Sequence, residues 1–172
     1  CHPTDANSCK GAQVGTPVPF EGAKFAFLAA NVVETKTGKT LFPPYTVKQW
    51  GNVRLALIGM TLKDTPSIVT PSGVAGLSFK DEAATVNALI PKLRARGVNA
   101  IVILLHQGGT TPVTQAEDTI NSCVGNLAGT PIQPIVAGLD DAVDLVITGH
   151  THQAYNCQLP NRIGRAIPVT SA

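Results

Sequence analysis

The 172-residue sequence has little charge and no long apolar run. Charged residues make up 14% of the chain and the net charge is +2 at pH 7, which is too mild and too scattered for a nucleic-acid-binding surface. The longest apolar stretches, such as NAIVILLH, are much shorter than the roughly 20 residues that span a bilayer. The first residues, CHPTDANSCK, lack the basic patch and apolar run of a signal peptide. With 44% hydrophobic residues, the composition predicts one globular domain with a core.

Cysteine is scarce, and its spacing is not typical of a metal site. The four cysteines are Cys1, Cys9, Cys123 and Cys157, and no two of them form a CxxC motif. Cys1 and Cys9 bracket a turn-rich loop, whereas Cys123 and Cys157 flank a histidine-bearing strand. Four cysteines allow three pairings, and the sequence does not choose among them. We interpret them as disulfide-bonded, which predicts a periplasmic or extracellular protein; four thiols in a cytosolic protein are the alternative.

Short apolar runs bounded by turn-forming residues predict buried strands. The expected strands are FAFLAANVV (25–33), YTVKQW (45–50), VRLALIGMTL (53–62), VNAIVILLH (98–106) and DLVITGHTH (144–152). Gly51 and Asn52 form the turn of a hairpin between the second and third of these. Residues 63–81 are broken by prolines and glycines and are expected to be loop.

A helix is expected to begin near Asp81, whose side chain can cap it. Apolar residues keep helical spacing from Val86 to Leu93, and Gly97 marks the end. Pro91 lies inside this span and predicts a kink. A second helix is expected within 131–143.

The stretch 110–130 is polar and glycine-rich and predicts at most a short helix through Ile120 and Cys123. The order is therefore strand, helix, strand, loop with helix, strand, which indicates an α/β fold with buried strands. Ligands of open α/β sheets bind at the carboxyl ends of the strands.

Three of the four histidines lie at two such strand ends. His106 ends one apolar run and is followed by a glycine loop, and His150 and His152 follow another run and Gly149. Single histidines at such positions are mostly surface or core residues, but three at one sheet edge indicate metal ligands. Gly149 is expected to free the backbone so that both neighbouring imidazoles face one point. His2 has no such context and is expected to be a surface residue.

The histidine motifs also resemble a known family. GHTH after VDLVIT, with VILLH earlier in the chain, resembles the C-terminal signature half of the calcineurin-like metallophosphoesterases. FAFLAANVV, RLALIGMTLKDTP and GHTHQAYNC are similar to segments of the secreted bacterial 5′-nucleotidase and UDP-sugar hydrolase branch. The resemblance covers nearly the whole chain in order, and it implies a metallophosphoesterase-like α/β sandwich.

The resemblance implies a two-metal phosphoester hydrolase acting on nucleotides or nucleotide sugars. Two divalent ions (zinc, manganese or iron) would lie at the strand ends, bridged by an aspartate and by the water that attacks phosphorus. His106 and His150 would bind one ion and His152 the other.

The chain departs from the family in its other ligands. The Asp-x-His, Gly-Asp and Gly-Asn-His blocks are missing, and Asn31 lacks a following histidine, so we expect it to be part of a strand. We expect residues 1–172 to be part of one catalytic domain, incomplete at both ends and without the nucleotide-binding domain. The chain alone should have little activity and need the missing segments or a partner fragment. The alternative is a non-catalytic fragment, or a binding or packing domain, with a vestigial metal site.

Overall fold

The computed structural model describes residues 23–112 and 118–171. The strands are β1 (Val32–Glu34), β2 (Tyr45–Trp50), β3 (Val53–Met60), β4 (Leu77–Phe79), β5 (Ala100–Leu105), β6 (Leu145–Ile147), β7 (Tyr155–Pro160) and β8 (Ala166–Ser171). The helices are α1 (Thr65–Ile68), η1 (Pro71–Val74), α2 (Glu82–Ala95), η2 (Val124–Leu127) and α3 (Ile132–Ala137), of which η1 and η2 are 3₁₀ helices. No helix in these ranges is long and apolar enough to cross a membrane.

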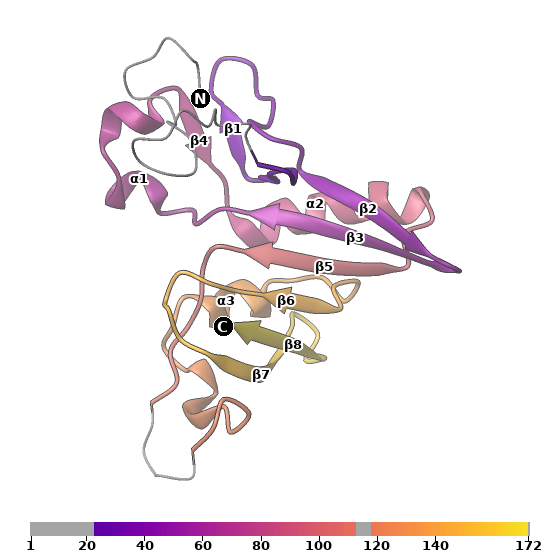
Figure 1. Ribbon diagram of the computed structural model, residues 1–172, viewed down its shortest axis with the longest axis vertical. Coiled ribbons are helices and arrows are strands. Elements are labelled where there is room, and N and C mark those ends of the chain that lie inside the picture. Colours follow the sequence, from indigo (N-terminus) through magenta and orange to yellow (C-terminus); the bar gives the residue numbers. More distant parts are fainter. Residues whose placement is uncertain (1–22, 113–117, 172) are drawn as a thin grey trace, which may run out of the picture.

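Six strands form one mixed sheet in the order β2-β3-β5-β6-β8-β7 (Figure 1). The four central strands, β3, β5, β6 and β8, run parallel, and the outer strands β2 and β7 run antiparallel to their neighbours. Strands β1 and β4 form a separate two-stranded sheet. This arrangement confirms the α/β fold class.

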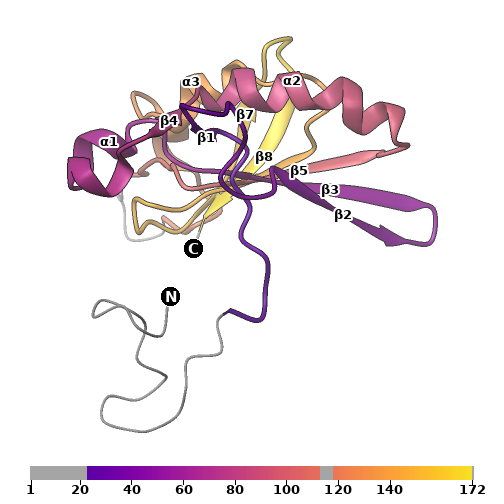
Figure 2. The same ribbon diagram turned by 90° about the horizontal axis from the view of Figure 1, so that it is seen from above.

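One face of the large sheet is covered by helices. Both α2 and α3 lie on the same side of it (Figure 2). The apolar face of α2 contributes Val86, Ile90 and Leu93 to a core that includes Ile58 and Ile103 from the sheet. The close packing of these side chains against the central strands supplies the apolar burial that stabilises the fold.

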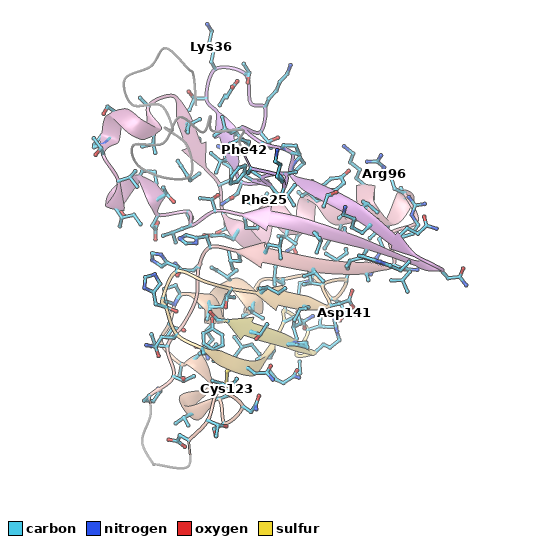
Figure 3. All side chains as sticks on the ribbon, in the orientation of Figure 1. Phe25, Lys36, Phe42, Arg96, Cys123 and Asp141 are labelled. Atoms are coloured by element: carbon cyan, nitrogen blue, oxygen red, sulfur yellow. A yellow bond between two sulfur atoms is a disulfide. The ribbon has the colours of Figure 1, made fainter. Side chains whose placement is uncertain are left out.

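The opposite face of the sheet is more open. Leu55, Leu57 and Leu104 alternate with the buried residues of β3 and β5 and are half-buried, while Ile147 of β6 is 40% exposed. The chain crosses this face at Gly59, where a Cβ atom would lie 2.4 Å from the Cβ atom of Leu28. The neighbouring rings of Phe25, Phe27 and Phe42 are exposed beside the crossing (Figure 3).

The structure confirms the predicted hairpin and the first predicted helix. Strands β2 and β3 pair in full register from Tyr45 with Ile58 to Trp50 with Val53. Helix α2 begins after Asp81, whose Oδ1 atom accepts a hydrogen bond from the Ala84 amide at 2.9 Å. Pro91 lies within this helix.

The predicted strand 25–33 and the predicted loop 63–81 are wrong in part. Only Val32–Glu34 is a strand, and its partner is β4, which lies in the expected loop together with α1 and η1. Asn31 organises this region, because its buried side chain bonds to the backbone of Thr61 in both directions and donates to the Lys80 carbonyl. The expected helix through Ile120 and Cys123 is also absent, since η2 begins at Val124.

Candidate metal centre

The two histidine-bearing loops leave adjacent strands at the same edge of the sheet. Strands β5 and β6 pair in parallel, with Leu104 opposite Ile147. His106 follows β5 directly, and its amide donates to the Met60 carbonyl at 2.9 Å, which continues the ladder with β3. His150 follows β6 after a short turn. The parallel pairing therefore brings both histidines to one carboxyl edge.

The imidazoles of His106 and His150 meet at this edge. Their ring centroids are 5.1 Å apart, and the ring planes are inclined at 67°. Both side chains are exposed, so that ring nitrogens are accessible to a ligand from solvent. The structure thus brings together two of the three histidines that the sequence singles out.

The backbone at the second loop is strained. His150 has a φ of 71° and His152 a φ of 54°, a region that non-glycine residues rarely adopt. Gly149, which was expected to provide the conformational freedom, does not have a positive φ; this expectation was wrong, and the strain falls on the histidines themselves. Such strain costs roughly 1–3 kcal/mol per residue and persists where the surrounding structure enforces it, which is common at functional sites.

The geometry of the His106–His150 pair fits shared coordination of one ion. Imidazole nitrogens at about 2.1 Å from a zinc ion, separated by a tetrahedral angle, place the two ring centres roughly 5 Å apart. His152 does not complete a group of three with this pair, because no three histidine, cysteine, aspartate or glutamate side chains gather as a metal site in the described parts of the chain. The pair alone is an incomplete ligand set.

A cleft of about 490 Å³ adjoins the pair on the open face of the sheet. Its lining includes His106, Thr148 and Gly149 from the histidine-bearing loops, together with the apolar side chains of Phe25, Phe27 and Ile147. The cleft therefore joins the histidine edge to the exposed apolar surface.

The loops beside the histidines are held by residues that sequence reasoning missed. Tyr155 is 1% exposed, and its hydroxyl contacts the Gly109 amide and the Thr148 hydroxyl. Tyr155 occupies an ordinary alternating position of a strand, so its sequence context carried no signal of this role. Only the fold shows that its side chain ends between the two loops.

Cys123 and Cys157 form a disulfide that ties the loop before η2 to β7. Cys157 is buried in the core, and Cys123 packs against the core from the lower end of the molecule (Figure 3). The predictions for Cys1, Cys9 and His2 lie outside the described residues.

No protein-family model matches the sequence, but curated relatives do. The chain is 34% identical over 131 residues to the cell wall protein Lmo0130 of Listeria monocytogenes, 28% identical over 144 residues to a 5′-nucleotidase of Vibrio cholerae, and 27% identical over 157 residues to the endonuclease YhcR of Bacillus subtilis. These matches cover 75%, 83% and 87% of this chain, respectively, but only 17%, 24% and 12% of the relatives. The chain therefore spans a quarter or less of the length of these proteins.

Solved structures show the same fold. A 5′-nucleotidase precursor from Thermus thermophilus superimposes with a TM-score of 0.64 at 25% identity, over 87% of this chain and 28% of that one. The calcineurin-like phosphoesterase YfkN from Bacillus subtilis superimposes with a TM-score of 0.59 at 22% identity, over 87% of this chain and 47% of that one. In sequence the chain is similar to bacterial 5′-nucleotidases, and it shares the fold of a solved 5′-nucleotidase precursor and of the calcineurin-like phosphoesterase YfkN.

Proposed function

We propose that this chain contributes histidine ligands to a metal-dependent phosphoester hydrolase of the 5′-nucleotidase type, with nucleotides or nucleotide sugars as substrates. The observation that carries the proposal is the His106–His150 pair, with ring centroids 5.1 Å apart at the carboxyl edge of two parallel strands. The sequence relation to a Vibrio cholerae 5′-nucleotidase supports the substrate class.

In this proposal His106 and His150 bind one divalent ion, and His152 binds a second. Zinc, manganese and iron all accept imidazole nitrogen as a ligand. When bound, such ions hold phosphate oxygens and offset the charge that develops as a phosphoester is cleaved. The imidazoles would hold the ions beside the cleft that His106 lines, where a phosphate group could approach from the open face.

Neutral imidazoles do not offset the four positive charges of two divalent ions, so carboxylates are also needed. No carboxylate joins the histidine pair as a metal-binding group among residues 23–112 and 118–171. We infer that the carboxylates lie elsewhere in the same catalytic domain, of which residues 1–172 are one part. Two facts support this. The chain spans a quarter or less of the length of these relatives. The described residues also leave one face of the parallel strands partly exposed, whereas parallel sheets are normally covered on both faces.

An exported location accompanies this proposal. The Cys123–Cys157 disulfide is the kind of bond that persists in oxidising compartments. The relation to a Listeria monocytogenes cell wall protein agrees with the periplasm or the cell exterior.

The metal content of the purified chain tests the ligand assignment. Elemental analysis after dialysis against zinc or manganese should find close to one ion per chain in the wild type, because the described residues bring two imidazoles together at this edge. His106→Ala and His150→Ala should each lose most of that ion, whereas His152→Ala should retain it. Equal metal content in all four proteins would contradict the assignment.

The activity is tested by comparing this chain with the full product of its gene. Phosphate release from nucleotides should be near background for the 172-residue chain and readily measured for the full product, and His150→Ala should abolish it there. Equal activity of the two wild-type proteins would contradict the incomplete site. If the full product releases no phosphate, or if His150→Ala leaves its activity unchanged, the result would favour a non-catalytic role for the histidine pair.

A further inference from the structure

The buried hydroxyl of Tyr155 lies between the two loops that carry the histidine pair. Tyr155 is the first residue of β7 and is 1% exposed. The Gly109 amide donates a hydrogen bond to its oxygen at 3.2 Å, and the Thr148 hydroxyl oxygen lies 2.6 Å away. Gly109 follows His106 in one loop, and Thr148 precedes His150 in the other. One side chain therefore contacts both loops.

The Thr170 carbonyl determines which hydroxyl is the donor in each of these hydrogen bonds. The Thr148 hydroxyl donates to the Thr170 carbonyl at 2.9 Å, and a carbonyl oxygen only accepts. The single hydrogen of Thr148 is thereby used, so Tyr155 must donate to Thr148. The phenolic oxygen of Tyr155 is then the acceptor for the Gly109 amide. Each hydroxyl in the chain donates once and accepts once.

The same loops are also joined without Tyr155. Thr151, which lies between His150 and His152, donates its hydroxyl to the Gly109 carbonyl at 2.7 Å. At Gly108 a Cβ atom would lie 2.4 Å from the Gly149 carbonyl oxygen, so the loops touch through their backbones. Gly109 thus donates its amide hydrogen to Tyr155 and accepts at its carbonyl oxygen from Thr151.

We propose that Tyr155 is a positioning residue, which holds His106 and His150 at the separation at which both bind one divalent ion. The proposal rests on the proposed function of the pair and adds the residue that sets its geometry. Without the phenolic oxygen the buried Gly109 amide loses its acceptor, which is costly in a protein interior. The loops then keep the Thr151 hydrogen bond to the Gly109 carbonyl but lose the contact that joins Gly109 to Thr148, and we expect the separation of His106 and His150 to change.

The test compares Tyr155→Phe with Tyr45→Phe. Tyr45 is the only other tyrosine, and its hydroxyl accepts from Arg96, outside the histidine loops. In the metal-free protein, proton nuclear magnetic resonance should show cross-relaxation between the rings of His106 and His150. We expect this signal in the wild type and in Tyr45→Phe, and its loss in Tyr155→Phe. A missing signal in the wild type, or a retained signal in Tyr155→Phe, would overturn the proposal.

Metal affinity provides the second measurement, with cobalt(II) as a spectroscopic probe. Tyr155→Phe should weaken cobalt binding about tenfold, in the range seen when residues that support metal ligands are removed. In a His150→Ala background the same substitution should have no further effect, because the pair no longer exists. An equal tenfold loss in both backgrounds would show a general structural role and overturn the proposal.

A variant of the neighbouring residue covers the case in which Tyr155→Phe does not fold. Thr148→Val removes the acceptor of the Tyr155 hydroxyl while keeping a similar shape, and it should also abolish the inter-ring signal. Failure of the wild type to bind cobalt would count against the proposed metal function alone, since the inter-ring signal tests the positioning by Tyr155 without metal.

Discussion

The two faces of the six-stranded sheet have similar apolar residues but different surroundings. On one face Ile101 and Ile103 are 0% and 2% exposed beneath α2 and α3. On the other face, Leu57 and Leu104 are half-buried and Ile147 is 40% exposed. Parallel strands are apolar on both sides when both sides are buried. The strands therefore have the composition of a doubly covered sheet, whereas the described part of the chain covers one face.

The largest expected effect comes from the disulfide that anchors the covered face. Replacing Cys123 and Cys157 together by alanine should lower the free energy of unfolding by about 4 kcal/mol, the chain-entropy value for a crosslink of this length, since the two residues are 34 positions apart. Urea unfolding of the oxidised wild type and the double variant measures the difference. A loss below about 1 kcal/mol would mean that the loop before η2 contributes little to this face.

Neighbouring residues of β5 test the contrast between the faces directly. Ile103→Ala removes a side chain from the closed core and should cost about 3 kcal/mol. Leu104→Ala is the matched control on the open face, and it should cost about 1 kcal/mol because its side chain already contacts water. Chemical denaturation at several protein concentrations measures both. Equal losses would break the comparison and indicate that the open face is covered in solution by another copy of the chain.

The covered face was also the more predictable one from sequence. Helix α2 has a capping aspartate and apolar spacing that depend only on nearby residues, and the Gly51-Asn52 turn defines the β2–β3 hairpin locally. In contrast, β1 pairs with β4 across more than forty residues of sequence. Residues 25–31 resemble a buried strand in composition, but their contacts depend on Asn31 and Gly59, which no local pattern indicates.

The candidate site shows the same division. The location of His106 and His150 could be predicted, because parallel neighbouring strands must end at one edge. The backbone conformation of the loop after β6 could not be predicted. His150 has a positive φ there, and this loop contacts the loop after β5, some forty residues earlier in the sequence. Tyr155 was missed for the same reason: its hydrogen bonds to Gly109 and Thr148 arise only when three separate segments fold together.

Two glycine variants, at Gly108 and at Gly149, test whether the two histidine-bearing loops are in direct contact. Gly108→Ala would bring a Cβ atom to 2.4 Å from the Gly149 carbonyl oxygen, whereas a Cβ at Gly149 would have its nearest neighbour, the His106 ring, at 3.9 Å. We expect Gly108→Ala to cost about 2 kcal/mol by forcing the loops apart, and Gly149→Ala to cost less than about 0.5 kcal/mol. Thermal unfolding of both variants checks this, and a tolerated Gly108→Ala would show that the loops are not in contact in solution.

The smallest expected effect comes from the residues that precede two helices: Asp81 before α2, which covers the closed face, and Asp64 before the short helix α1. Asp81 precedes α2 and accepts a hydrogen bond from the Ala84 amide, so Asp81→Ala should cost about 1 kcal/mol. Asp64 precedes α1 in the same way but makes no capping hydrogen bond through its side chain, so Asp64→Ala should leave the free energy of unfolding within about 0.5 kcal/mol of the wild type. Because α2 packs on the core and α1 buries no residue, only loss of the first cap should be coupled to global unfolding. Urea titrations of the two variants decide this, and equal losses would mean that α1 is as firmly integrated into the fold as the helix over the closed face.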